Sequence, residues 1–305
     1  MSRTSDPDPL PAPLPASVPG NRIWRVETPD GPVVQKLYDR RTPWPREELR
    51  ALLTALAGRK TSPRWTQRRL TEQRLLARWA AEGFDVPREL SAEHPGLAGP
   101  RQLVLEWVGG PHLLHVLKAK SATPRPARDQ LLTRFASEWR RRHDLATERD
   151  DPSYIQEHGS LAHVLVVDGR LVTYDLEQGY RSRGSVFPAL AKEVADTLRT
   201  LRGRGDPDHW KDDLRTLVAA YGDRDRLQRV VDRYLRPANP VLRLVWAVDR
   251  LHERLTDRRG SKSEALAGLE QVLHEAPPPA ADERPATPNG TSDTPRALAG
   301  DPGPR

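Results

Sequence analysis

Alternating hydrophobic and polar residues predict two β-hairpins, one near the start of the chain and one near its middle. The first is IWRVETPDGPVVQKLY, residues 23–38, which turns at a Pro-Asp-Gly sequence. The second is HVLVVDGRLVTY, residues 163–174, and its central Asp-Gly pair suits the φ > 0 positions of a type I′ turn. In that register Ala162 pairs with Asp175, so we expect Asp175 to lie close to His163.

Apolar residues at helical spacing predict a series of helices. We expect them at 46–58, 65–82, 126–143, 187–201, 206–222, 224–234, 240–256 and 262–274. A strand at 103–108 precedes Gly109-Gly110, and the proline-rich ends, 1–19 and 276–305, are predicted to be disordered. The pattern therefore predicts an α+β architecture of two lobes, with a small β-rich lobe at 20–108 and a larger helical lobe at 109–275.

Composition narrows the class of protein. The chain has 305 residues and no cysteine, so disulfides and thiolate metal sites are excluded. No apolar run approaches the roughly 18 to 20 residues of a membrane span, and we expect a cytoplasmic protein.

The net charge of +7 comes from 49 Lys and Arg, most of them Arg. The short arginine clusters are interpreted as solvated helix faces, and no specific nucleic-acid partner is predicted; the clusters are Arg40-Arg41, Arg68-Arg69, Arg140–Arg142 and Arg258-Arg259. Nucleic-acid binding through these clusters stays an alternative, and a basic surface is also compatible with peripheral contact with an anionic membrane.

Lys36 and Glu72 are the first candidates for chemistry. Lys36 alternates with Val34 and Tyr38 on the second strand of the first hairpin. Glu72 shares a helical stripe with apolar residues, where a carboxylate requires a cation, so we predict that the two form a pair. The alternative is that Lys36 is an edge residue whose stem covers the sheet while its ammonium reaches water.

A strand lysine, a helix glutamate, a strand ending in glycines and a later aspartate follow one another in the order used by protein kinases. The chain resembles the lipopolysaccharide kinase family, which contains the Kdo and core-heptose kinases, within the protein-kinase-like superfamily. The matching segments span about residues 20 to 205 and are GNRIWRVETPDGPVVQKLY, RRLTEQRLLARWAAEGFDVP, LVLEWVGG, EHGSLAHVLVVDGRLVTYDLEQG and LAKEVADTLRTLRGR.

The resemblance implies a two-lobed protein-kinase-like fold with ATP and Mg²⁺ as cofactors. By this resemblance Lys36 contacts the phosphates, Glu72 orients Lys36, and Asp175 is the Mg²⁺ ligand. The hinge beside the adenine would run from Glu106 to Gly109 and include Val108. The implied function is ATP-dependent phosphoryl transfer to a hydroxyl of a sugar or lipopolysaccharide-type glycan.

Two positions depart from the family pattern. Ser160 stands where the resemblance implies a catalytic Asp, and a serine hydroxyl is no base at pH 7. His163 stands where the family has a metal-binding Asn, so the resemblance implies a second metal ligand there. A neutral imidazole suits Mg²⁺ less well than oxygen does, and the alternative is that His163 orients a phosphate or packs. Substitute proton acceptors are His158, Glu157 and Glu177. The alternative function is a pseudokinase that binds nucleotide or a partner protein without efficient phosphoryl transfer.

Overall fold

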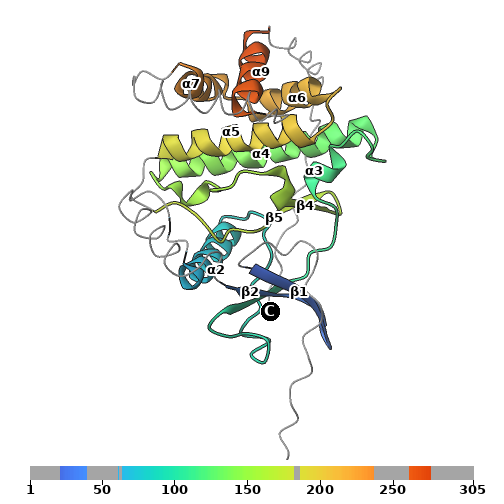
Figure 1. Ribbon diagram of the computed structural model, residues 1–305, viewed down its shortest axis with the longest axis vertical. Coiled ribbons are helices and arrows are strands. Elements are labelled where there is room, and N and C mark those ends of the chain that lie inside the picture. The colour runs from blue at the N-terminus through green and yellow to red at the C-terminus, as the bar shows by residue number, and fades with distance from the viewer. Residues whose placement is uncertain (1–20, 40–60, 62–63, 182–185, 237–260, 276–305) are drawn as a thin grey trace, which may run out of the picture. The chain divides into compact units, whose positions relative to one another are not determined.

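The computed structural model describes residues 21–39, 61, 64–181, 186–236 and 261–275. Those up to His274 belong to one compact unit. It is a mixed α/β structure in which a small antiparallel sheet from the early part of the chain is followed mainly by helices (Figure 1). The helices expected at 46–58 and 240–256 and the two proline-rich ends lie outside the described residues. The boundary between two lobes at residue 108 stays a prediction.

The N-terminal sheet consists of β1 (Asn21–Thr28), β2 (Gly31–Tyr38) and β3 (Gln102–Glu106), in the order β1-β2-β3. Neighbouring strands are antiparallel, and Thr28 lies opposite Gly31 across the first turn. The predicted hairpin is therefore confirmed. The third strand ends at Glu106, two residues earlier than expected, because the chain there turns toward the Gly-Gly connector.

Helix α2 (Trp65–Ala81) packs against β2 and β3. Its buried stripe carries Glu72, Leu76 and Trp79, as the helical spacing predicted. The apolar members of this stripe join the main core, so the helix is held in a fixed rotation about its axis. That rotation sends the Glu72 side chain toward the sheet.

The second hairpin consists of β4 (Val164–Val167) and β5 (Arg170–Thr173). The turn residues Asp168 and Gly169 have φ values of 49° and 74°, as a type I′ turn requires. One further hydrogen bond continues the ladder, since the Tyr174 amide donates to the His163 carbonyl at 3.0 Å. The predicted register is confirmed, and it brings the residues after β5 back toward His163.

Helices account for most of the remaining regular structure in the described chain. They are α3 (Leu113–Val116), α4 (Arg125–Glu148), α5 (Val186–Arg204), α6 (Trp210–Tyr221), α7 (Arg224–Leu235) and α9 (Lys262–His274), with 3₁₀ turns at Pro152–Tyr154 and Leu161–His163. Helix α4 packs against α5 and α6, and α9 covers α5 and α7 (Figure 1). The start of α6 was predicted too early because the Asp206 side chain accepts a hydrogen bond from the Asp208 amide and forms a turn.

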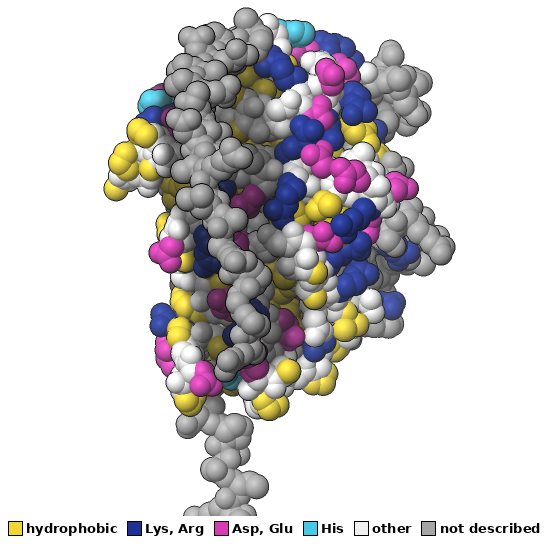
Figure 2. Space-filling model, turned by 180° about the vertical axis from the view of Figure 1, so that it is seen from behind, with side chains coloured by type: hydrophobic (Ala, Val, Ile, Leu, Met, Phe, Trp, Pro, Cys, Tyr) yellow, Lys and Arg dark blue, Asp and Glu magenta, His cyan; other side chains and the backbone are white. Residues whose placement is uncertain are grey.

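On the face drawn in Figure 2, basic and acidic side chains of the described residues lie interspersed. These residues form no large patch of one charge sign on that face. Among the described residues, no helix is both long enough and apolar enough to span a bilayer.

Candidate functional site

Lys36 is the centre of the candidate site. Its side chain, on β2, is 4% exposed, and its Nζ donates to Glu72 Oε2 and to Asp175 Oδ1, each at 2.7 Å. Glu72 comes from α2, and Asp175 lies in the segment that follows β5. The predicted pair of Lys36 and Glu72 is thus present, and a single ammonium group joins three segments that are far apart in the sequence.

The surroundings keep the Lys36 ammonium charged. Burial alone would lower the pKa of Lys36, but the Asp175 and Glu72 carboxylates outweigh burial and raise this pKa above its ordinary value. Tyr38 also donates its hydroxyl to Glu72, and burial together with the Glu72 charge raises the pKa of the Tyr38 phenol. Glu72 therefore accepts hydrogen bonds from two donors and is held in place.

Asp175 combines exposure with an unusual backbone. Its side chain is 26% exposed, compared with 1% for Glu72. Its φ of 64° lies in the left-handed region, which non-glycine residues seldom adopt and which is enriched at functional sites. The Asp175 carboxylate is consequently the member of the cluster best placed to meet a ligand.

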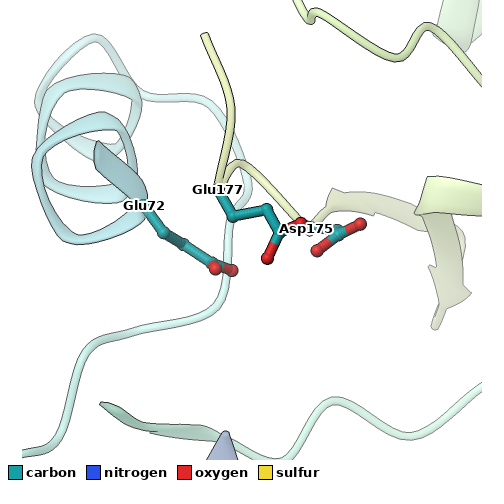
Figure 3. Close-up of side chains that lie close together, drawn as sticks. All are labelled: Glu72, Asp175 and Glu177. Carbon is teal, nitrogen blue, oxygen red and sulfur yellow. The ribbon is translucent and has the colours of Figure 1, made fainter. Parts of the chain in front are cut away.

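Three carboxylates point toward one another at this site (Figure 3). They belong to Glu72, Asp175 and Glu177, and one oxygen from each lies within 4.8 Å of the others. Oxygen donors of this kind suit Mg²⁺. Since Lys36 and Arg68 balance two of the three negative charges, the group could hold one further cation.

Arg68 and Asn21 were missed as site residues. The Arg68 side chain is fully buried, donates to Asn21 Oδ1 at 2.6 Å and lies 3.2 Å from Glu177 Oε2. Asn21 begins β1, and its amide also donates to Glu177. The interpretation of Arg68 as part of a solvated face was therefore wrong. One signal was available, because Arg68 precedes Glu72 by four residues on the same buried stripe.

The loop before the second hairpin holds Ser160 in a structural role. Ser160 precedes the 3₁₀ turn Leu161–His163, and its hydroxyl accepts a hydrogen bond from the Ala162 amide at 3.2 Å. His158 is 53% exposed, and its Nε2 lies 2.6 Å from the buried Glu157 carboxylate. The loop thus presents an exposed imidazole beside a buried acid.

His163 lies next to Asp175, with its Nε2 3.8 Å from Asp175 Oδ2. Its Nδ1 is 3.2 Å from the His158 carbonyl oxygen. Burial lowers the pKa of His163 although the Asp175 carboxylate opposes this shift, so the ring is neutral at pH 7. A neutral ring with one nitrogen facing a backbone carbonyl braces the loop.

Helix α5 packs against the loop that carries His158 and Ser160. A Cβ on Gly159 would lie 2.6 Å from the Glu193 carbonyl oxygen, so the loop backbone packs directly on the helix. The buried Glu193 carboxylate accepts from the Gln156 amide at 3.0 Å and pairs with Arg142 at 2.8 Å. The interpretation of Arg140–Arg142 as a solvated face was accordingly wrong for Arg142, which is buried.

The two residues expected at the hinge lie at and beyond the end of β3. Glu106 is exposed, and its carboxylate accepts a hydrogen bond from the Arg88 amide at 3.2 Å. Val108 is half-buried in the segment that leaves the sheet. The structure brings together Lys36, Glu72, Asp175 and His163, while the roles of Glu106 and Val108 stay predictions.

Comparison with known proteins finds similarity among solved structures. No family model matches the sequence, and no curated protein matches it. Among solved structures, the chain is similar to WaaP in complex with acyl carrier protein, at 17% identity and a TM-score of 0.46, covering 81% of this chain and 89% of WaaP. It is also similar to an apo pseudokinase, at 14% identity and a TM-score of 0.38, covering 87% of this chain and 92% of that one. At these identities and TM-scores the similarity assigns no function, substrate, cofactor or partner to this chain.

Proposed function

We propose that this protein is a kinase-type phosphotransferase that binds ATP with Mg²⁺ and acts on a hydroxyl of a sugar or lipopolysaccharide-type glycan. One observation carries the proposal: Lys36 Nζ lies 2.7 Å from both Glu72 and Asp175. A buried ammonium between a buried glutamate and a more exposed aspartate resembles the arrangement with which protein kinases bind phosphate and Mg²⁺.

Each member of the cluster has a separate task in this proposal. Lys36 exchanges its bond with Asp175 for one with a phosphate oxygen, and Glu72 keeps the ammonium in position. Asp175 then holds Mg²⁺, which when bound neutralises charge on the phosphates. Tyr38 fixes the Glu72 carboxylate by its hydrogen bond.

In this proposal His158 is the general base that accepts the proton of the acceptor hydroxyl. Ser160 is no base at pH 7, and its hydroxyl already contacts the Ala162 amide. The His158 imidazole is exposed and has the Glu157 carboxylate at 2.6 Å. A general base is worth about 10² to 10⁴ in rate, whereas phosphoryl transfer depends mainly on positioning and charge neutralisation, so a slow kinase is compatible with Ser160.

Ser160 also favours a second candidate function, that of a pseudokinase. In this case the protein binds nucleotide at the same cluster, or binds a partner protein, without efficient phosphoryl transfer. The two candidates differ in ADP release with a lipopolysaccharide-type oligosaccharide as acceptor. Release by the wild type supports the kinase, while binding without release supports the pseudokinase and predicts a gain of activity in Ser160→Asp.

The first test is a thermal-shift titration with ATP, with and without Mg²⁺. Ligand at 100 times its dissociation constant should stabilise the wild type by about 2.7 kcal/mol, a rise in Tm of roughly 5 to 10 °C for a domain of this size. In Asp175→Asn the part of the shift that depends on Mg²⁺ should disappear, because the charge of the proposed ligand is removed.

Asp168→Asn is the matched control. Asp168 also has a positive φ, but it lies exposed at the tip of the β4–β5 hairpin. This variant should keep the full wild-type shift. A wild type that shows no shift with any nucleotide would rule out the kinase and the nucleotide-binding form of the pseudokinase.

A further inference from the structure

A second buried ion pair lies beside the Lys36 cluster and has no task in the proposed function. Glu177, two residues after Asp175, has a side chain that is only 3% exposed. Its Oε2 lies 3.2 Å from Arg68 Nη1 and 3.8 Å from Lys36 Nζ. Removing such a carboxylate from water is costly, so its partners must compensate for the lost hydration.

Arg68 contributes to this compensation and also connects other parts of the fold. It donates to Asn21 Oδ1 at 2.6 Å and to the Asp39 carbonyl. Its guanidinium also lies 5.9 Å from the centre of the Tyr38 ring. Arg68 thereby ties the first residue of β1 and the end of β2 to helix α2.

The charges alternate in sign through the buried group. Arg68 contacts Glu177, Glu177 lies near Lys36, and Lys36 contacts Glu72. Helix α2 supplies both ends of this row, Arg68 and Glu72, which are four residues apart and therefore on one face. A shift of α2 would break both ion pairs together and leave buried charges without partners.

The segment 175–179 also packs directly on α2, which is independent evidence that the position of α2 and that of Asp175 depend on each other. A Cβ on Gly179 would lie 2.9 Å from Leu75 Cδ1, so the backbone after Glu177 rests on the helix. Thr61 adds hydrogen bonds in both directions, from its amide to the Gly179 carbonyl at 2.9 Å and from the Gly179 amide to its hydroxyl at 3.1 Å. Residues 175–179 are therefore docked along α2.

We propose that Arg68 and Glu177 are positioning residues that set Asp175 and Lys36 for binding of the magnesium–nucleotide complex. The inference rests on the proposed function, since it concerns the same site. Arg68 and Glu177 act through the placement of α2 and of the segment 175–179. They need not touch the nucleotide or the metal.

The test is a double-mutant cycle with Arg68→Lys, Glu177→Gln and the combined variant. ATP affinity is measured by calorimetric titration with and without Mg²⁺, and the stability of each variant by urea unfolding. Each single change should weaken Mg²⁺–ATP binding by about 10- to 100-fold, as expected for residues that orient a metal ligand. The combined variant should bind no more weakly than the weaker single variant, because both changes break one interaction.

The matched control is the exposed pair that Arg149 forms with Glu82, just past the C-terminal end of α2. Arg149→Lys, Glu82→Gln and their combination make the same chemical changes away from the site. These variants should keep wild-type affinity for Mg²⁺–ATP. A similar loss of affinity in this control cycle would overturn the proposed role of Arg68 and Glu177.

A purely structural role would give a different result. In that case Arg68→Lys and Glu177→Gln would lower stability, but the folded protein would bind Mg²⁺–ATP as the wild type does, and the inference would be wrong. If neither variant folds, Asn21→Ser is the test, because it removes the side-chain amide that bridges Arg68 and Glu177 and keeps both charges. Weaker binding of Mg²⁺–ATP by this variant supports the inference, and unchanged binding overturns it. A wild type that binds no nucleotide would instead disprove the proposed function, and the inference with it.

Discussion

Lys36 shows how one side chain can tie distant segments together. Its ammonium is buried between Glu72 and Asp175, at 2.7 Å from each. A buried charge of this kind is tolerated only with partners, and removal of one partner costs more than the pair itself contributes. The site is therefore also a structural element of the protein.

Replacement of Lys36 by Met tests whether the buried Lys36 cluster stabilises the fold. The variant leaves the Glu72 carboxylate buried without its ammonium partner, so we expect a loss of about 3 to 5 kcal/mol in the free energy of unfolding. Lys36→Met combined with Glu72→Leu should recover most of the loss, because both charges are then absent. Urea unfolding of both variants gives the comparison, and a single variant as stable as the wild type would contradict it.

Some of these residues could be predicted from the sequence and others could not. Strand alternation and helical spacing place Lys36 and Glu72 on buried faces, so their pairing followed from the need of each charge for a partner. Arg68 stands beside Arg69 in a polar run and has the appearance of a surface residue. Its place four residues before Glu72 on one helix face was the one signal in the sequence, and the contacts of Arg68 with Asn21 and Glu177 became visible only in the structure.

At the scale of elements, the connector after β3 pairs with the second hairpin. The Val166 amide donates to the Pro111 carbonyl at 2.9 Å, and His112 forms a bridge with Leu165. Gly110 has a φ of 135°, and a Cβ there would lie 2.3 Å from the Val166 carbonyl oxygen. The connector is thus fixed to the hairpin that leads to Asp175.

Gly110→Ala should disrupt this contact. The added methyl group meets backbone rather than a movable side chain, and the φ value is unfavourable for alanine, so we expect a loss of roughly 1 to 3 kcal/mol. Gly96→Ala is the control, since a Cβ at Gly96 has no atom within 4 Å and its φ is not left-handed. Thermal unfolding measures the stability of both variants. Equal stability of Gly110→Ala and Gly96→Ala would contradict the expected loss.

The hairpins could be predicted because the turn residues and the alternation of each lie within one short, continuous segment of the chain. The pairing of the connector with β4 could not. Its partners are more than 50 residues apart, and the connector has too few residues to show a strand pattern. The short helix α3 follows directly and is likewise below the length at which helical spacing is visible.

At the scale of the whole molecule, a buried charge network joins the large helices. Glu193 on α5 contacts Arg142 and His143 on α4, and His143 contacts the Tyr221 hydroxyl on α6 at 2.8 Å. Burial alone would raise the pKa of Glu193, but Arg142 and the hydrogen bond from His143 outweigh it and lower this pKa to about 2. Burial also lowers the pKa of His143, so its ring is neutral.

These shifts predict a loss of stability in acid. Glu193 has an ordinary pKa of 4.5 and a lowered pKa in the folded state, so its contribution is complete above pH 4.5 and falls as the pH approaches 2. The contribution lost is about 3 kcal/mol. His143 also lowers the stability as the pH falls below 6.5, because its pKa in the folded state is lowered and the unfolded chain binds the proton more readily. Urea unfolding between pH 7 and pH 2 measures the effect.

Glu193→Gln should be less stable at pH 7 and should lose less stability between pH 5 and pH 2 than the wild type. Glu264→Gln, at a half-exposed carboxylate paired with Arg202, is the control and should follow the wild-type curve. Identical pH profiles for Glu193→Gln and the wild type would show that Glu193 does not cause the acid sensitivity.

The left-handed backbone of Asp175 means that two requirements act on one position. A metal ligand there needs a carboxylate, while a φ of 64° by itself favours glycine, asparagine or aspartate over other residues. A protein with this fold and no phosphoryl transfer would therefore keep aspartate here for conformational reasons alone. Retention of this residue among relatives is a weak indicator of activity, and replacement by a bulky or β-branched side chain would be a strong indicator that the segment itself has been rebuilt.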